Sequence, residues 1–175
     1  MRLFTVIGPA QSGKSTLVAA LAGLEGRAQR FEIADAAALT QFRYLDEDWA
    51  AIDIVGGPDT LGYAGPALAA SDAAVLCVPA GVDAAVLAAP YIRLVEEAGI
   101  PCFLFLNKID ASADRVRDTV AALQTYCGHN IVLRQVPIRD GGTVTGSVDL
   151  ISERAWHYNE GKPSDLIELP VDVQP

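Results

Sequence analysis

The chain has 175 residues, 51% of them hydrophobic, which is enough for one well-packed core and a small appended unit. A net charge of −9 argues against a nucleic-acid-binding surface, so no direct DNA binding is expected. No apolar run approaches transmembrane length and the N-terminus lacks a signal-peptide pattern, so we expect no membrane contact and a cytoplasmic location.

The first motif lies near the N-terminus, where an apolar run over residues 2–7 predicts a strand and residues 14–22 predict a helix. Between them the chain fits G-x-x-x-x-G-K-[ST], the phosphate-binding loop. Backbone N–H groups and the helix N-terminus would bind phosphates. The predicted nucleotide-binding residues here are Gly8, Gln11, Ser12, Gly13, Lys14, Ser15 and Thr16.

Two of these side chains have individual roles. Lys14 would reach the β- and γ-phosphates from an exposed loop–helix junction, and the Ser15 hydroxyl would be a ligand of Mg²⁺. The alternative is a glycine-rich turn with an incidental lysine. The preceding strand and following helix favour the phosphate loop.

Strands and helices then alternate, which predicts a mostly parallel sheet with helices on both faces. We expect a hairpin over residues 36–55, turned at the acidic residues 46–48, which form either a solvated turn or, less favoured, a divalent-ion site. The remaining predicted elements are a helix over 60–70, a strand over 73–78, a helix over 83–98, a buried strand over 102–106 and a helix over 112–127 with Ser112 as N-cap.

A second motif, Asn107-Lys108-Ile109-Asp110, follows the strand over residues 102–106. In GTP-binding folds this pattern recognises guanine. The Asp110 carboxylate would accept hydrogen bonds from the ring N–H and the exocyclic amine, which adenine does not offer together. A polar strand-to-helix turn is the alternative, but ligands bind at the carboxyl ends of such strands. Asn107, Lys108 and Asp110 are therefore the predicted guanine-binding residues.

The alternation of predicted strands and helices ends after residue 128. Residues 131–138 are strand-like, 139–142 form a turn, and 146–151 and 155–158 predict short antiparallel strands, with Trp156 and Tyr158 covering a small core. We predict a nucleotide-binding domain over residues 1–128 and a second part over 129–175.

Cysteines and histidines give no sign of a further site. Cys77 and Cys102 lie in apolar runs and are expected to be core thiols, while Cys127 ends a helix. His129 and His157 are isolated from other metal-binding side chains, so neither is predicted to act as a ligand or an acid–base group.

With these motifs the chain resembles the N-terminal part of elongation factor G and its paralogues among the translational GTPases. Further stretches typical of that family are residues 52–55 before Pro58, 67–76, 97–101, and 136–138 followed by 146–150. The resemblance implies a P-loop α/β fold of the Ras-like G-domain type and the start of a small α/β inserted subdomain. It also implies GTP or GDP with Mg²⁺ as cofactors, and the ribosome as partner. The family's last sheet strand, with its Ser-Ala-x loop, and its further domains are absent, so we expect a truncated chain.

The sequence departs from the family at its second phosphate motif, Asp-Thr-Pro-Gly-His. Aligned on Pro58, Gly56 replaces the carboxylate that holds the metal's water shell, and Asp59 replaces the glycine that senses the γ-phosphate. Thr60 replaces the histidine that orients the attacking water. Because phosphoryl transfer depends on positioning and charge neutralisation, hydrolysis by this chain is doubtful.

The first switch departs as well, because its metal-binding threonine aligns with Ala34. Asp53 or Asp59 is an alternative metal carboxylate, although Asp53 is three residues early and is expected to face the wrong side of its strand. Three hypotheses follow: an elongation factor G-like GTPase, a non-hydrolysing guanine-nucleotide-binding interaction module, or, least favoured, an unrelated P-loop kinase or ATPase.

Overall fold

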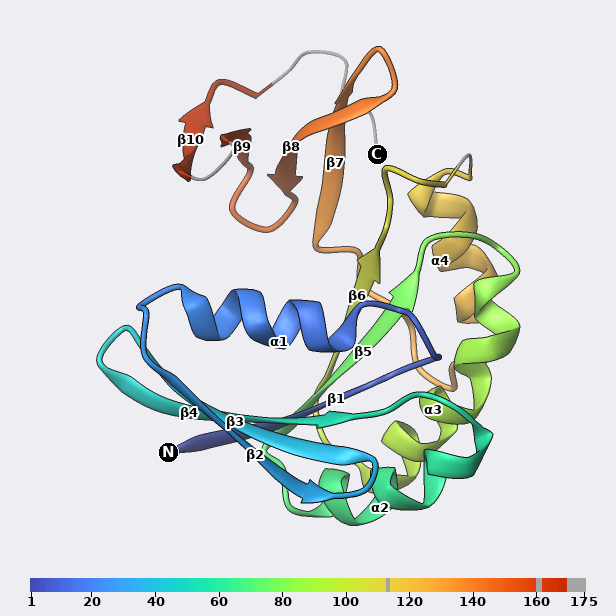
Figure 1. Cartoon of the computed structure of the whole chain (residues 1–175). Coiled ribbons are helices and arrows are strands. Elements are labelled where there is room, and N and C mark those ends of the chain that lie inside the picture. Colours follow the sequence, from blue (N-terminus) through green and yellow to red (C-terminus); the bar gives the residue numbers. More distant parts are fainter. Residues whose placement is uncertain (113, 160–161, 170–175) are drawn as a thin grey trace.

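A computed structural model of the chain describes residues 1–112, 114–159 and 162–169. Its larger sheet has six strands in the order β2-β3-β4-β1-β5-β6 (Figure 1). Strands β4, β1, β5 and β6 pair in parallel, whereas β3 pairs antiparallel with both β2 and β4. The strands are β1 (Arg2–Ile7), β2 (Ala28–Ala34), β3 (Ala37–Tyr44), β4 (Glu47–Ile54), β5 (Ala73–Pro79) and β6 (Cys102–Asn107). The predicted parallel-dominated α/β fold is confirmed.

Helices cover both faces of this sheet, as predicted (Figure 1). They are α1 (Lys14–Gly23), the short 3-10 helix η1 (Pro58–Thr60), α2 (Leu61–Ala69), α3 (Ala84–Ala98) and α4 (Val116–Gln124). One hydrophobic cluster joins α1 to the sheet through Val6 and Val18, and another joins α2 and α3 to the opposite face through Ile7 and Leu68. Adjacent residues of β1 therefore serve different cores, which explains its continuous apolar run. Among the described residues, no helix is long and apolar enough to cross a membrane.

The prediction that residues 102–106 form a buried strand is wrong, because β6 is the edge of the sheet. Leu104 and Leu106 pack against the core on one face, whereas Phe103 and Phe105 are 62% and 38% exposed on the other. Cys102 is exposed as well, so it is not a core thiol, unlike the buried Cys77.

Other element boundaries also differ from expectation. The hairpin has an additional strand, β2, which lies at the opposite edge of the sheet, and the last helix begins at Val116 and not at Ser112. The hairpin turns at Leu45 and Asp46, both with positive φ. Asp46 is fully exposed there, and the other two acidic residues of the turn are exposed as well. The acidic turn therefore faces solvent.

A second sheet follows α4, with four antiparallel strands in the order β10-β9-β8-β7 (Figure 1). Its strands are β7 (Gln135–Asp140), β8 (Thr143–Asp149), β9 (Arg154–Asn159) and β10 (Lys162–Ile167), the last of which was not predicted. The described residues after α4 form strands and no helix. Trp156 is half-buried, but Tyr158 is 48% exposed and does not cover the core. The domain boundary at residue 128 stays a prediction.

Asp149 closes the turn between β8 and β9. Its Oδ1 accepts hydrogen bonds from the backbone N–H groups of Ile151 (2.9 Å) and Ser152 (3.0 Å), and its Oδ2 accepts from Arg134 (3.1 Å). The Ser152 N–H is the largest cause of a lowered Asp149 pKa, since it favours the charged form.

We therefore expect Asp149 to contribute stability at neutral pH. Because its folded-state pKa is lowered, this contribution is present above about pH 4 and is lost as the pH falls through the lowered value. Thermal unfolding at pH 7 and at lower pH should show that Asp149→Asn is less stable than wild type at pH 7 and less sensitive to acid. Asp140→Asn, which alters an exposed residue of the same sheet, is the control and should match wild type. An Asp149→Asn variant as stable as wild type at pH 7 would contradict this account.

Candidate functional site

The loop between β1 and α1 approaches its neighbours very closely at its two glycines, a backbone carbonyl at one and a side-chain amide at the other. A Cβ on Gly8 would lie 2.0 Å from the carbonyl oxygen of Cys77, and one on Gly13 would lie 2.1 Å from Nδ2 of Asn107. Both glycines also have positive φ, 143° and 96°. Only glycine allows this conformation and these approaches together. At the apex, Gln11 is exposed with a φ of 59°.

The N-terminus of α1 opens onto this loop. Gly13 is its N-cap, and among the described residues no side chain caps the helix. The first N–H groups of an uncapped helix are free donors with a partial positive charge, which favours an anion. Ser15 and Thr16 in the first turn are exposed, so the helix end is accessible.

Lys14 does not lie at an exposed junction as predicted, since it is only 6% exposed. Its Nζ donates to the backbone oxygens of Gly8 (3.1 Å) and Pro9 (2.8 Å). Burial lowers the pKa of Lys14, and the nearby Asp53 carboxylate opposes this effect. The loop thus folds around the ammonium group, because its carbonyl oxygens are the available acceptors. This arrangement places the Lys14 nitrogen in the centre of the loop.

Beside the loop, Ser15 contacts a buried carboxylate, which the sequence analysis gave only as an alternative metal ligand. The Ser15 hydroxyl donates to Oδ2 of Asp53 at 2.5 Å, and Nη1 of Arg30 lies 3.7 Å from the same oxygen. Asp53 is 4% exposed, and its Oδ1 has no hydrogen-bond partner among the described residues. The expectation that Asp53 faces the wrong side of β4 is therefore wrong.

The segment aligned with the second phosphate motif is closed upon itself. The Thr60 hydroxyl contacts the backbone oxygens of Val55 (2.5 Å) and Gly57 (2.9 Å), and the Gly57 N–H donates to the Tyr91 hydroxyl (2.9 Å). The Thr60 hydroxyl and the Gly57 N–H are thus engaged within the protein. Asp59 is exposed on η1.

The segment aligned with the first switch is part of the sheet. Residues 31–34 belong to β2, and Ala34 pairs with Ala37 of β3. A strand with this pairing is held by backbone hydrogen bonds, so the segment differs from a loop that reorders around a nucleotide.

The predicted guanine-binding motif is attached directly to the phosphate loop. Asn107 Nδ2 donates to the backbone oxygen of Ser12 (2.8 Å), and its Oδ1 accepts from the Lys108 N–H (2.9 Å). Ser12 is fully buried, and the Cys77 thiol, whose pKa burial raises, donates to the same oxygen at 3.2 Å. Asp110 is exposed in the turn after β6. The structure therefore brings the two predicted motifs together.

Arg139 supports this turn and was missed by sequence reasoning. Its guanidinium, on β7, donates to the backbone oxygens of Ile109 (2.7 Å) and Gly142 (3.0 Å). It thereby links the second sheet to the turn that carries Asp110. No signal in the sequence identified it, because the contact spans 30 residues between separate elements.

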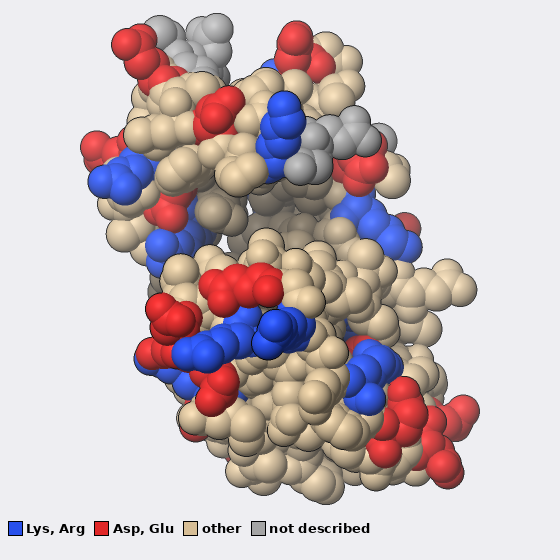
Figure 2. All heavy atoms as spheres, turned by 60° about the vertical axis from the view of Figure 1, so that its left-hand side comes forward, with Lys and Arg blue, Asp and Glu red and all other residues tan. Residues whose placement is uncertain are grey.

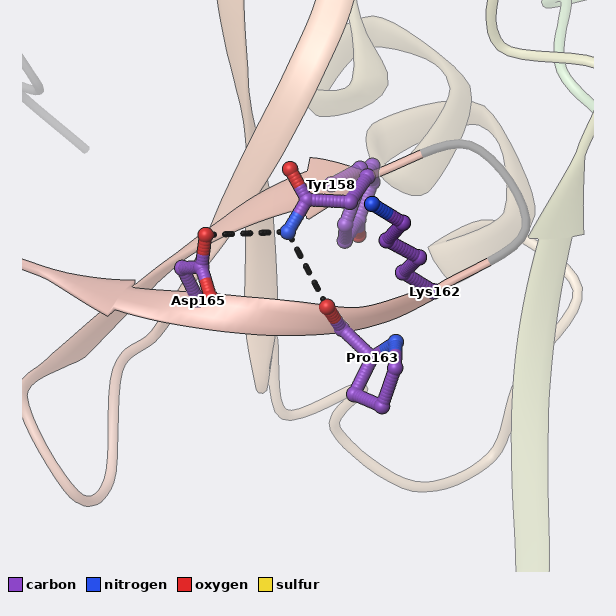
Figure 3. A pocket seen from close by; sticks show the side chains of 5 residues that line it. Tyr158, Lys162, Pro163 and Asp165 are labelled. Atoms are coloured by element: carbon purple, nitrogen blue, oxygen red, sulfur yellow. Dashed lines mark hydrogen bonds between the residues drawn. The ribbon is translucent and has the colours of Figure 1, made fainter.

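The surface outside the loop offers weaker candidates. A hollow in the second sheet is lined by Tyr158, Asn159, Lys162, Pro163 and Asp165 (Figure 3). Its Asn159 amide already donates to Pro163 O and Asp165 Oδ2, both at 3.0 Å. Basic and acidic side chains interleave on the face shown in Figure 2. That face carries no continuous basic surface for nucleic acid.

Comparison with known proteins gives relatives over nearly the whole chain, although no protein-family model matches. The chain is 30% identical over 167 residues to the mitochondrial elongation factor G of Drosophila grimshawi, covering 93% of this chain and 22% of that protein. It is 24% identical over 192 residues to an elongation factor G-like protein of Synechocystis, covering 99% of this chain and 29% of that protein. It spans about a quarter of the length of these relatives.

The fold is also found in a solved structure. A protein of Thermus thermophilus superposes with a TM-score of 0.83 at 24% identity, covering 98% of this chain and 28% of that protein. Over nearly its whole length, this chain is thus a homologue of elongation factor G and elongation factor G-like proteins, as its motifs predicted.

Proposed function

We propose that the chain binds GTP and GDP as the nucleotide-binding unit of an elongation factor G-like translational GTPase. The observation that carries this proposal is the direct bond between Asn107 of the guanine motif and Ser12 of the phosphate loop. It places a base-recognition motif and an uncapped helix N-terminus at one edge of the sheet, where ligands bind in α/β folds.

In this proposal each predicted residue has a defined task. The N–H groups from Gln11 to Thr16 donate to the phosphates, and Lys14 transfers its hydrogen bonds from the Gly8 and Pro9 carbonyls to a phosphate. Ser15 fits a Mg²⁺ ligand, because its hydroxyl is exposed and lies beside a buried carboxylate with an unpaired oxygen. When bound, Mg²⁺ would neutralise phosphate charge.

The base would be held at the other end of the site. The Asn107 side chain fixes the start of the motif against the loop, which leaves the Asp110 carboxylate exposed to accept from the two guanine donors. Arg139 fixes the backbone just before Asp110. A preformed turn loses less conformational entropy when the base binds.

We further propose that the chain acts with the ribosome in the cytoplasm, during elongation or ribosome remodelling. The proposed partner and location rest on homology to elongation factor G alone. They need a test of their own, because the chain spans only about a quarter of the length of these relatives. Co-sedimentation with purified ribosomes, with and without GDP, tests it; a chain that remains entirely in the supernatant would contradict ribosome binding by this unit.

A second candidate is a non-hydrolysing guanine-nucleotide-binding module. Two observations favour it: the Thr60 hydroxyl and the Gly57 N–H are engaged inside the protein, and Gly56 carries no carboxylate. Nucleotide binding is common to both candidates, so the first experiment concerns base selectivity.

We expect the chain to bind GDP more tightly than ADP, because Asp110 can accept two hydrogen bonds only from guanine. Asp110→Asn should weaken GDP binding by about 2 kcal/mol or more, because it replaces a charged acceptor with an amide. The NH₂ group of this amide would then face an N–H donor of the guanine base. The same variant should improve binding of xanthosine diphosphate, whose 2-oxo group can accept from the new amide. Titrations with fluorescent nucleotides measure all three.

Asp118→Asn on α4, an exposed change outside the motif, is the matched control and should keep the affinity for GDP. Equal affinities for ADP and GDP in the wild-type chain would contradict guanine recognition and favour an unrelated P-loop enzyme.

A further inference from the structure

Asp53 is a buried anion with unused hydrogen-bonding capacity. It is 4% exposed. Its Oδ2 accepts a hydrogen bond from the Ser15 hydroxyl at 2.5 Å, whereas its Oδ1 has no hydrogen-bond partner among the described residues. The nearest ion-pair partner is Arg30, whose Nη1 lies 3.7 Å from Oδ2 and not from the unpaired oxygen. A buried carboxylate with an empty acceptor is unfavourable unless a cation or donor reaches it.

The position where the alignment expects a metal carboxylate is closed. A Cβ on Gly56 would lie 2.5 Å from Gly8 O and Pro9 C, and 2.6 Å from the backbone nitrogen of Ala10. These are backbone atoms of the phosphate loop, which cannot move aside as a flexible side chain does. No side chain at position 56 can therefore serve a metal without displacing the loop itself.

The chemistry beside Ser15 suits Mg²⁺. This ion prefers hard oxygen ligands, keeps several waters, and is commonly bound through one or two carboxylates together with nucleotide phosphates. Because the Ser15 hydroxyl donates its hydrogen bond to Asp53, its oxygen lone pairs remain for a cation. Among the described residues no group of three acidic, cysteine or histidine side chains could hold a metal alone, so binding here requires the phosphates of a nucleotide.

We propose that Asp53 and Ser15 hold the Mg²⁺ of the bound nucleotide, and that Asp53 takes the role that Gly56 has lost. The metal carboxylate has in this chain moved three residues toward the start of β4. This inference rests on the proposed nucleotide binding. It makes two predictions that a structural Asp53–Arg30 ion pair does not: Mg²⁺ dependence of GDP affinity through Asp53, and close approach of the metal to Asp53.

The first test compares GDP affinity in Mg²⁺ and in EDTA. Wild type should bind GDP at least about tenfold more tightly with Mg²⁺, and Asp53→Asn should lose most of this gain while keeping its affinity in EDTA within about twofold. Asp59→Asn, at the other carboxylate near the motif, should keep the full gain. Arg30→Gln should also keep it, because it removes only the ion pair.

The second test uses the wild-type chain, so it does not depend on whether a variant folds. With ¹³C-labelled protein, Mn²⁺ and GDP together should broaden the side-chain carboxyl signal of Asp53 beyond detection, whereas the carboxyl of Asp46, in the turn at the other end of β4, should remain visible. Mg²⁺ and GDP should leave both signals sharp.

The outcomes separate the inference from the function on which it rests. A full Mg²⁺ gain in Asp53→Asn, or an Asp53 signal that stays sharp with Mn²⁺ and GDP, overturns the metal role while guanine-nucleotide binding stands. A wild-type chain that binds no GDP in either buffer overturns both.

Discussion

Lys14→Met should lower the affinity for GDP by at least about a hundredfold, because it removes the ammonium group at the centre of the phosphate loop while keeping most of the side-chain volume. Charge-assisted hydrogen bonds to phosphate are worth about 1.5–3 kcal/mol each, and Lys14 is positioned to supply more than one. The methionine matters because Lys14 is 6% exposed, so an alanine would leave a cavity.

Two measurements separate lost binding from lost folding. Thermal unfolding without nucleotide should show a folded Lys14→Met domain, since the displaced ammonium bonds only to the Gly8 and Pro9 carbonyls and to Ser12. Titration with fluorescent GDP should show the loss of affinity. Lys162→Met, on β10 of the second sheet, is the matched control and should bind as wild type does. A folded Lys14→Met variant with wild-type affinity would contradict the phosphate-loop assignment.

The parts of this site that sequence predicted are those fixed by local chain geometry. The loop from Gly8 to Thr16 requires a strand, glycines and a helix start in immediate succession, and its contacts at Gly8 and Gly13 leave no space for another residue. The motif from Asn107 to Asp110 similarly follows directly from the end of β6. Motifs of this kind carry their structure within about ten residues.

The parts that sequence missed depend on contacts between distant segments. The orientation of Asp53 follows from where β4 lies beside α1, 38 residues from Ser15, and not from its spacing to Pro58. Arg139 reaches Ile109 from another sheet. Both contacts depend on tertiary placement, which local propensity does not determine.

The errors in the elements have a related cause. The apolar sequence of β6 indicates a strand buried on both faces, yet only Leu104 and Leu106 pack against a hydrophobic cluster. Phe103 and Phe105 on the other face belong to neither cluster of the described residues and are exposed. The strand β2 was missed because its seven residues are almost all exposed and include Arg30 and Glu32, which obscures the apolar pattern. Predictions that rely on the apolar pattern of the sequence are therefore least reliable for edge strands.

The second large effect that we expect is the near absence of GTP hydrolysis, with or without ribosomes. A general base or water-positioning group contributes about 10²–10⁴-fold to such a step. The residue aligned with that group, Thr60, already uses its hydroxyl within its own turn, contacting Val55 O and Gly57 O. Holding Mg²⁺ through Asp53 would neutralise phosphate charge but would not orient an attacking water.

For the same reason we expect GDP to bind at least as tightly as GTP. A nucleotide switch requires contacts that the triphosphate makes and the diphosphate does not. Here the exposed carboxylate of Asp59 stands where the family has its γ-phosphate-sensing glycine, and the segment aligned with the first switch is strand β2. A γ-phosphate would therefore meet an additional negative charge.

Phosphate release and nucleotide affinity, both measured with Mg²⁺, test this expectation. Asp59→Gly is an informative variant, because it removes the exposed carboxylate from the position where the family has its γ-phosphate-sensing glycine. If this carboxylate is what opposes the γ-phosphate, the variant should gain affinity for GTP relative to GDP, whereas wild type should not prefer GTP. Ribosome-stimulated turnover by wild type, or GTP binding more than about tenfold tighter than GDP, would show that other residues supply the missing contacts. The non-hydrolysing candidate would then be wrong, and a translational GTPase with a rearranged switch would be the better account.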